Sequence, residues 1–563
     1  MPYIGGASSD NYIGNVPTTG GITGGAGADG AAGADGAAGG TATVTASGAI
    51  TAGDLVGLNT DGTAGKINQL IYSGGEVRAP IAGGGNDLNH GYVATDGSGT
   101  YLFIYTDTNA LNYAYAVAAT YSAGTWTFGS AVALSSDQSQ SYAYPRACWD
   151  ASSSTFNIIY GRNTQHAWVV ACSVSGTTIT MGTAVQITSS VFSYVGQDIF
   201  DIAHDPDSGR NVAVYYNYSD IHIRSWSVSG TTITLGTAVQ VNTAATINGK
   251  AALAYDTTNN QFLVAYYLSN QKIGTNIATV SGTTFTIGTE SSFDIDGVVN
   301  SDGIFRLLYS STKDLFVLLH SEISVGMVFA SVIEISGTSM LYGYEYDHAI
   351  VGSQGGSGLT WVTSNGDNDF YLLSNTGALY GSLNILSKFH ILDSTSVTVA
   401  DPIYLPLLTV DTGSASVRET NNVAICYDSG SDSLTIGAIM EYTDGTYNVD
   451  EGMYAWNINL TTFERYSNFL GIADQDIADT ATGSVTVIGG VNEKVSGLTT
   501  GRKYHIDPET GSLSEKNNYV NKSSNAAVGN NAPFWYNSKA PGSNPVGIAL
   551  SATKLLVTRM LNG

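Results

Sequence analysis

Short apolar segments recur along the middle of the chain, and a turn containing Asp or Ser precedes each one. Near-continuous apolar runs of this length are typical of strands that are buried on both faces. The segments are 101–105 (YLFIY), 156–160 (FNIIY), 211–216 (NVAVYY), 262–267 (FLVAYY), 315–319 (LFVLL), 370–373 (FYLL) and 434–440 (LTIGAIM). The turn residues, spaced 51 to 64 residues apart, are Asp96, Asp150, Asp205, Asp256, Ser310, Ser364 and Asp428.

A second pattern follows several of these segments and consists of Gly, Thr and an apolar residue in alternation. The clear copies are Gly176–Gly182 (GTTITMG), Gly230–Gly236 (GTTITLG) and Gly282–Gly288 (GTTFTIG). Looser copies lie at Gly124–Gly129 and Gly337–Gly343. Alternating Thr exposes one face of a strand, so we expect an outer, edge strand at each copy. No segment has a convincing amphipathic helical period.

A repeat of about 50 residues made only of strands and turns predicts a β-propeller, because one such sheet cannot bury its faces alone. The seven turn residues predict seven blades within residues 85–465. The last two copies have lost the Gly-Thr-Thr pattern, so six or eight blades remain alternatives. The fold class that we predict is therefore all-β, with a propeller inserted in, or followed by, a small β-domain.

The two ends of the chain differ from the repeats. Residues 1–20 are polar, and residues 21–40 carry Gly at every third position from Gly21 to Gly39. A strict Gly-x-y period suits three chains wound about one axis and predicts a collagen-like stalk and a homotrimer; a flexible tether is the alternative. Residues 41–80 read as a short β segment, and residues 466–563 as a C-terminal β domain.

Charge and composition narrow the partners. The chain has 563 residues, of which 67 are Gly and 34 are Tyr, and its formal net charge is −25. Such a surface repels phosphate, so we expect no nucleic-acid partner. The N-terminus lacks the basic and apolar regions of a signal peptide, and no apolar run of 18 residues predicts membrane insertion. We expect no cofactor; structural Ca²⁺ at Asp205–Gly209 or Asp294–Gly297 is an alternative to simple turns.

Several phrases at the two ends occur in the same order in a known class of proteins. They are Tyr12–Pro17, the Gly-x-y stalk, Ala49–Asn59, Phe469–Ala473, Ser496–Gly511 and Val546–Leu556. With them the chain resembles structural proteins of tailed-bacteriophage virions, especially tail-fibre and head-fibre chains. The resemblance implies a place on the virion surface, an N-terminal anchor that binds other virion proteins, and first and last strand groups that form one domain around an inserted propeller. It carries over no functional residues.

Catalytic patterns are weak. The nearest string to a sialidase box, Ser122–Trp126 (SAGTW), lacks the Asp-x-Gly core. Acidic residues are numerous, but most lie in turns, where carboxylates cap backbone N–H groups. The histidines show no metal-binding spacing, and Cys148, Cys172 and Cys426 form neither a disulfide framework nor a metal motif. We expect a protein that is not an enzyme.

Tyrosine is the most suggestive chemical feature, because its ring can stack on a sugar while its hydroxyl forms hydrogen bonds. Candidate glycan-binding residues near repeat loops are Tyr113, Tyr115, Tyr142, Tyr144, Tyr216 and Tyr218. The alternative is that Tyr is simply a good strand residue. The sequence predicts a tail fibre or host-attachment fibre that binds a cell-surface receptor, glycan before protein. A head fibre or decoration protein without a receptor, and a polysaccharide-degrading propeller enzyme, are the alternatives.

Overall fold

The structure is a computed structural model, and it describes the chain from residue 40 to residue 558 with gaps. The described residues are 40–78, 88–107, 113–122, 124–134, 145–162, 166–188, 199–217, 220–243, 246–268, 271–295, 299, 304–321, 328–336, 339–348, 360–375, 384–394, 396–399, 403–405, 416–443, 449–507, 510–515 and 545–558. The expected anchor, all of the stalk but Gly40, and Tyr142, Tyr144 and Tyr218 lie outside them. The chain divides into two compact units. Unit 1 holds Met1–Ile71, Ile458–Ser524 and Pro533–Gly563, and unit 2 holds Tyr72–Asn457 and Asn525–Ala532.

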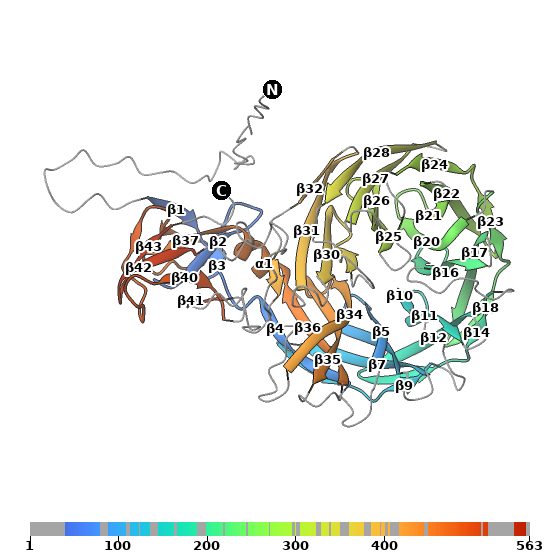
Figure 1. Ribbon diagram of the computed structural model, residues 1–563, viewed down its shortest axis with the longest axis horizontal. Helices are drawn as coiled ribbons and strands as arrows, with labels where there is room; N and C mark the ends of the chain where they lie inside the picture. The colour runs from blue at the N-terminus through green and yellow to red at the C-terminus, as the bar shows by residue number, and fades with distance from the viewer. Residues whose placement is uncertain are drawn as a thin grey trace, which may run out of the picture. The chain divides into compact units, whose positions relative to one another are not determined.

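Unit 2 is a ring of seven antiparallel sheets, the blades of a β-propeller (Figure 1). Blade 1 contains β5 (Leu88–Thr95), β6 (Thr100–Asp107), β7 (Tyr113–Ser122), β8 (Thr125–Phe128) and β9 (Val132–Ala133). Blade 2 contains β10 (Arg146–Asp150), β11 (Thr155–Arg162), β12 (His166–Ser175), β13 (Thr178–Met181) and β14 (Val185–Gln186). Blade 3 contains β15 (Phe200–Asp205), β16 (Arg210–Asn217), β17 (Asp220–Ser229), β18 (Thr232–Leu235) and β19 (Val239–Gln240).

The remaining blades keep the same strand order. Blade 4 contains β20 (Thr246–Asp256), β21 (Gln261–Leu268), β22 (Lys272–Ser281), β23 (Thr284–Ile287) and β24 (Ser291–Asp294). Blade 5 contains β25 (Phe305–Ser310), β26 (Leu315–Ser321), β27 (Val328–Ser336) and β28 (Ser339–His348). Blade 6 contains β29 (Thr360–Ser364), β30 (Asp369–Asn375), β31 (Asn384–Asp393), β32 (Ser396–Val399) and β33 (Ile403–Leu405). Blade 7 contains β34 (Ser416–Asp428), β35 (Ser433–Thr443), β36 (Val449–Asn459) and β4 (Ile71–Arg78).

The ring closes because its last blade is built from both ends of the propeller sequence. Blade 7 takes three strands from residues 416–459 and its outer strand, β4, from residues 71–78. The first strand of every blade contacts the first strands of both neighbours, including β34 with β5. Closure pairs or covers strands that would otherwise be open edges. The predicted seven blades are confirmed, and the propeller begins at β4 rather than at residue 85.

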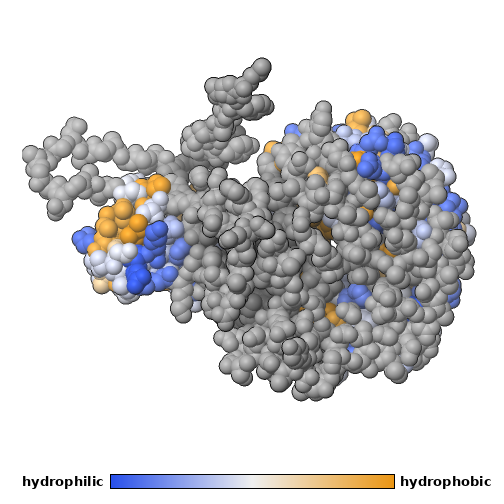
Figure 2. Space-filling model, viewed as in Figure 1, coloured by the Kyte–Doolittle hydropathy of each residue, from blue (hydrophilic) through white to orange (hydrophobic). Residues whose placement is uncertain are grey.

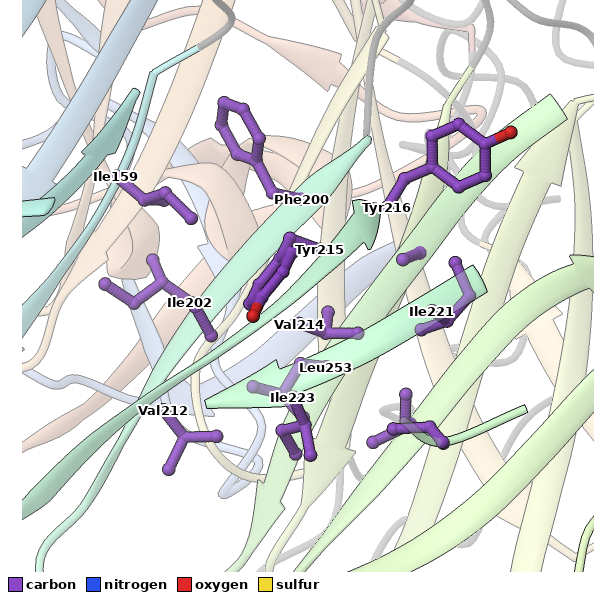
Figure 3. Close-up of a cluster of buried hydrophobic side chains, with 14 of the residues drawn as sticks. Ile159, Phe200, Ile202, Val212, Val214, Tyr215, Tyr216, Ile221, Ile223 and Leu253 are labelled. Atoms are coloured by element: carbon purple, nitrogen blue, oxygen red, sulfur yellow. The ribbon is translucent and has the colours of Figure 1, made fainter. Parts of the chain in front are cut away.

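The apolar runs seen in the sequence are the second strands of the blades. Residues 101–107 of β6, all of β11 and all of β21 are buried, as expected for strands covered by a neighbouring blade on each face. One continuous cluster joins blades 2, 3 and 4 and includes Ile159, Val214 and Leu253 (Figure 3). The predicted burial of these runs is confirmed, although the innermost strand of each blade is the one before it.

The Asp or Ser marker of each repeat lies at, or directly after, the end of the first strand of its blade, where the turn to the second strand begins. Oδ1 of Asp150 accepts hydrogen bonds from the backbone N–H groups of Ser152 (2.9 Å) and Ser153 (3.1 Å). Oδ1 of Asp205 does the same for residues 207 and 208, at 3.0 and 3.1 Å. These side chains therefore cap turns, which is the ordinary role of Asp at such positions.

The Gly-Thr-Thr pattern forms the outer strand of blades 2, 3 and 4, and in blades 1, 2 and 3 the last glycine of the clear or looser copy contacts the next blade. A Cβ atom at Gly182 would lie 2.2 Å from the carbonyl oxygen of Thr231, and one at Gly129 would lie 1.9 Å from that of Thr177. No side chain fits at such distances, so only Gly allows the outer strand of one blade to touch the turn of the next. The pattern is thus a blade-to-blade contact as well as an edge strand.

Unit 1 combines strands from both sides of the propeller insertion. One sheet has the order β1 (Thr41–Thr45), β38 (Thr482–Thr486), β37 (Phe469–Ala473), β2 (Leu55–Leu58), β3 (Ala64–Lys66). The other has the order β39 (Val491–Asn492), β43 (Lys554–Val557), β42 (Gly547–Ser551), β40 (Lys503–Ile506), β41 (Leu513–Ser514). Because β2 pairs with β37, the propeller is an insertion within this small β-domain.

Apolar atoms gather over β42 and β43 (Figure 2), where Leu550 is 47% exposed. Single exposed apolar side chains are normal on a protein surface.

Unit 1 also contains one short helix, α1 (Leu460–Ser467), which no amphipathic period in the sequence indicated. The side chain of Asn459 caps its first turn by accepting a hydrogen bond from the N–H of Thr462 (2.8 Å). Leu460, Phe463 and Tyr466 are buried. Eight residues are too few for a clear helical period in the sequence, and tertiary packing of one face stabilises so short a helix.

Candidate functional site

The two ends of the propeller differ in what the described residues can offer a ligand. Antiparallel pairing puts the turn between the first and second strands of every blade at one end, which we call the hairpin end. The second-to-third-strand links and the links between blades lie at the other, which we call the linker end. Most linker residues lie outside the described part of the chain, so the site there is built from the strand ends.

At the hairpin end the polar side chains already bond to one another between blades. Tyr101 of blade 1 donates to Oδ2 of Asp428 of blade 7 (2.5 Å), and Asn211 of blade 3 donates to Oδ2 of Asp150 of blade 2 (2.8 Å). Tyr255 of blade 4 donates to Oδ2 of Asp207 of blade 3 (2.8 Å). These bonds stabilise the ring, and they use groups that a ligand would need.

Two predicted tyrosines lie together at the linker end of blade 1. Tyr115 is directly opposite Tyr105 on the neighbouring strand, and their rings stack with centroids 5.8 Å apart. The ring of Tyr113 meets that of Tyr115 edge-on at 6.5 Å. Tyr113 and Tyr115 are half-buried, whereas Tyr105 is buried. Three rings therefore form an aromatic shelf beside the 108–112 link, and Tyr105 is the member that loop-based reasoning missed.

Blade 2 carries an aromatic pair at the same register. Trp168 lies opposite Tyr160, as Tyr115 lies opposite Tyr105. The guanidinium of Arg162 lies 3.9 Å from the centre of the Trp168 ring, a close cation–π contact. Burial lowers the pKa of Arg162, but a guanidinium remains protonated in proteins. Reasoning from the sequence missed this group. The repeat could have revealed it, because Trp168 lies 53 residues after Tyr115, which is the length of one repeat.

Blade 3 carries a ring pair at the same register, and it shows that one tyrosine predicted from the sequence does not belong to the site. Tyr215 stacks on His222 with ring centroids 5.9 Å apart. Tyr216 points in a different direction (Figure 3), is 3% exposed, and packs so that a Cβ at Gly249 would lie 3.0 Å from its ring. A ring covered in this way offers no face to a sugar, so Tyr216 is not part of the candidate site. Tyr218, like Tyr142 and Tyr144, lies outside the described residues.

The aromatic groups of blades 1 and 2 have the chemistry that contact with a sugar ring requires. Half-buried Tyr and Trp rings offer apolar faces held in place by their neighbours, and Tyr hydroxyls are donors and acceptors. The Arg162 guanidinium and the His166 imidazole add polar groups beside Trp168; Nδ1 of His166 lies 3.1 Å from Oγ1 of Thr188.

Two carboxylates, Asp256 of blade 4 and Asp314 of blade 5, come close together at the hairpin end. Nδ2 of Asn259 lies 2.9 Å from Oδ2 of Asp256 and 3.4 Å from both carboxylate oxygens of Asp314. Burial raises the pKa of Asp256, yet hydrogen bonds, chiefly from Asn259, hold it below its usual value. Glycosidic bond cleavage needs one carboxyl whose raised pKa keeps it protonated. Asp256, whose pKa is lowered, lacks that property.

Metal ligands are not gathered in the described part of the chain. No group of three or more His, Cys, Asp or Glu there could hold a metal ion. In the first predicted Ca²⁺ segment, Asp205 accepts hydrogen bonds from its own turn. In the second, Asp294 forms an ion pair with Lys272 at 3.1 Å, and residues 296–297 lie outside the described residues.

The three cysteines are free thiols, and burial raises the pKa of each. No helix among the described residues is long and apolar enough to cross a membrane.

Comparison with known proteins gives structural neighbours only. No family model matches the chain, and no curated protein matches it. The periplasmic gluconolactonase of Pseudomonas aeruginosa aligns with 64% of this chain and 96% of its own, at 10% identity and a TM-score of 0.42. A protein from Lactobacillus plantarum aligns with 62% of this chain and 94% of its own, at 12% identity and a TM-score of 0.40. A lectin of Aleuria aurantia in complex with a fucosylated sugar aligns with 54% and 92%, at 11% identity and a TM-score of 0.35.

Proposed function

We propose that this chain is a host-attachment fibre protein of a tailed bacteriophage, and that its propeller binds a cell-surface glycan without cleaving it. The observation that carries the glycan part is the repeated aromatic pair at the linker end. The shelf of Tyr105, Tyr113 and Tyr115 in blade 1 and the Arg162–Trp168 stack in blade 2 lie at the same register of neighbouring blades. Rings in such positions stack on sugars, with polar groups beside them for the hydroxyls.

The virion part of the proposal rests on the phrases at the chain ends and on the Gly-x-y segment. Residues 1–20 would bind other virion proteins, and residues 21–40 would bring three copies together as a trimer. Three propellers with several shallow sites each would bind a repetitive polysaccharide far more tightly than one site does. A trimer would have three times the 58.6 kDa mass of the chain, which sedimentation equilibrium measures directly.

Glycan binding is tested with the full chain on an array of bacterial surface polysaccharides. We expect binding to at least one polysaccharide, and a loss of about tenfold in affinity for Tyr113→Ala and for Trp168→Ala, equivalent to about 1.4 kcal/mol. Tyr427→Ala, at the hairpin end of blade 7, is the matched control and should bind as the wild type does. Equal binding by all four proteins would place the glycan elsewhere.

Two further measurements separate the parts of the proposal. Incubation with each bound polysaccharide should release no reducing ends, and release would instead support a depolymerase. Electron microscopy of particles carrying a label at the C-terminus of this chain should place the label at fibre tips on the tail. A label on the capsid would support a head fibre, and an unlabelled particle would remove the virion role while leaving glycan binding intact.

A further inference from the structure

One sheet of unit 1 carries an apolar row on the face that is turned away from the core of the domain. Val491 of β39 lies directly opposite Leu556 of β43, which lies opposite Ile548 of β42. Residues opposite each other in a sheet point to the same face, so the three side chains form one row across three strands. All three are half-buried, whereas Leu555 and Ala549, which point to the other face, are buried.

The row continues along β42 to Leu550, which is 47% exposed. We call Val491, Ile548, Leu550 and Leu556 the apolar face, and Figure 2 shows apolar atoms gathered over β42 and β43. A lone exposed leucine is ordinary on a protein surface. Neighbouring apolar side chains on three strands are not, and a patch of this kind marks a surface that contacts another protein.

The stalk segment ends beside the apolar face, at Gly40, the residue before β1. The backbone N–H of Val487 donates to the carbonyl oxygen of Gly40 (2.9 Å), and a Cβ at Gly40 would lie 3.4 Å from the carbonyl oxygen of Ile488. Ile488 is itself 47% exposed and lies three residues before Val491 of the apolar face. Copies of the chain that the stalk holds together would therefore meet at this part of unit 1.

The apolar face also lacks the negative charge that dominates the chain. Its four residues are uncharged, Lys503 of β40 lies opposite Ile548, and Glu493 beside the face is paired with Lys554 at 2.5 Å. A chain with a net charge of −25 repels its own copies over most of its surface. An uncharged face with basic residues next to it is where copies can approach one another most closely.

We propose that the apolar face packs against a second copy of this chain, next to the point where the stalk joins the copies. The inference rests on the proposed trimer and names the surface of the folded domain that completes it. A stable interface between free proteins buries about 1,200 Å² or more, and four side chains supply only part of that area. The stalk is therefore needed to hold the copies at a high effective concentration, at which a small contact is sufficient.

Sedimentation equilibrium of the full chain tests the contact. We expect the wild type to be a trimer, and Leu550→Asp to raise the dissociation constant of the trimer by about tenfold or more, because the variant puts a carboxylate into an apolar contact. Leu341→Asp is the matched control and should assemble as the wild type does, since Leu341 lies on β28 of blade 5 and is 56% exposed. Circular dichroism identifies any variant that does not fold.

Thiol labelling shows directly whether the apolar face is covered, and it decides the question where the trimer does not dissociate at measurable concentrations. In the trimer, a maleimide should modify Leu550→Cys at a rate about tenfold or more below that of Leu341→Cys, because a thiol under a partner chain is inaccessible. The wild type gives the background from its own three cysteines.

The two measurements separate failure of the contact from failure of the trimer. Equal labelling rates for Leu550→Cys and Leu341→Cys within a trimer overturn the contact and leave the trimer standing. A wild type that sediments as a monomer overturns both. Slow labelling of Leu550→Cys in such a monomer would mean that another segment of the same chain, and not a second copy, covers the apolar face.

Discussion

At the scale of single residues, the last glycine of the Gly-Thr-Thr pattern fixes how closely neighbouring blades pack. Gly182 of blade 2 faces the backbone of Thr231 in blade 3, where a Cβ would lie 2.2 Å from the carbonyl oxygen. The matching glycine of blade 4, Gly288, is less confined, because its nearest neighbour would be the Ile277 carbonyl oxygen at 3.3 Å. The same substitution should therefore have different effects at the two positions.

We predict that Gly182→Ala lowers the free energy of unfolding by about 1–3 kcal/mol, the usual cost of forcing an extra carbon into a packed contact. Gly288→Ala is the matched control and should cost well under half of that. Chemical denaturation of the two variants and the wild type measures the difference. Equal losses at both positions would mean that the contact with the next blade is not what requires glycine.

At the scale of the element, a buried carboxylate, Asp150, stabilises the first hairpin of blade 2 in its ionised form. Asp150 is fully buried. Burial raises the pKa of Asp150, but hydrogen bonds from Ser152, Asn211 and Ser153 outweigh it and hold the pKa below its usual value. A carboxyl with a lower pKa in the folded state than in the unfolded state stabilises the fold above the unfolded pKa, near 4, and loses that effect as the pH falls through the folded pKa.

Asp150→Asn removes this pH dependence along with the acceptor for Asn211 of the next blade. We predict a loss of about 1–3 kcal/mol at pH 7. The difference in the free energy of unfolding between wild type and variant should become smaller as the pH falls below about 4, because the wild-type carboxyl then becomes protonated. Asp220→Asn, at the linker end of blade 3, serves as the control. Urea denaturation across this pH range checks the prediction, and a gap that does not change with pH would contradict it.

The sequence predicts some elements of the fold and of the candidate site better than others. The turn markers and apolar runs predicted seven blades because every blade repeats the same local chemistry. Strand β4 gave no such signal, since its place in blade 7 comes from pairing with β36, almost 400 residues later in the chain. The Trp168–Arg162 stack could be found only from the register of the blades. Tyrosines 113 and 115 could be chosen from sequence alone because they start a strand.

At the scale of the whole molecule, the decisive element is the strand that closes the ring. β4 is the outer strand of blade 7, and it packs against blade 1: a Cβ at Gly75 would lie 2.1 Å from the ring of Phe128 and 3.1 Å from Cβ of Trp126. Without β4, the edge of β36 and these two aromatic rings would lose their cover. An open edge beside exposed aromatic side chains favours association with other chains.

We therefore predict that a fragment of residues 72–457 folds as a monomeric propeller. A fragment of residues 79–457, which lacks β4, should unfold at a temperature at least about 5 °C lower and should self-associate. The reason is that the shorter fragment loses several kcal/mol of strand pairing and packing. Thermal unfolding and gel filtration of the two fragments, with the full chain alongside, measure both effects. The comparison isolates seven residues, 72–78, and leaves every other strand of the ring in place. A shorter fragment that stays monomeric and unfolds at the same temperature would mean that the ring closes through the contact of β34 with β5 alone, and that β4 is dispensable for closure.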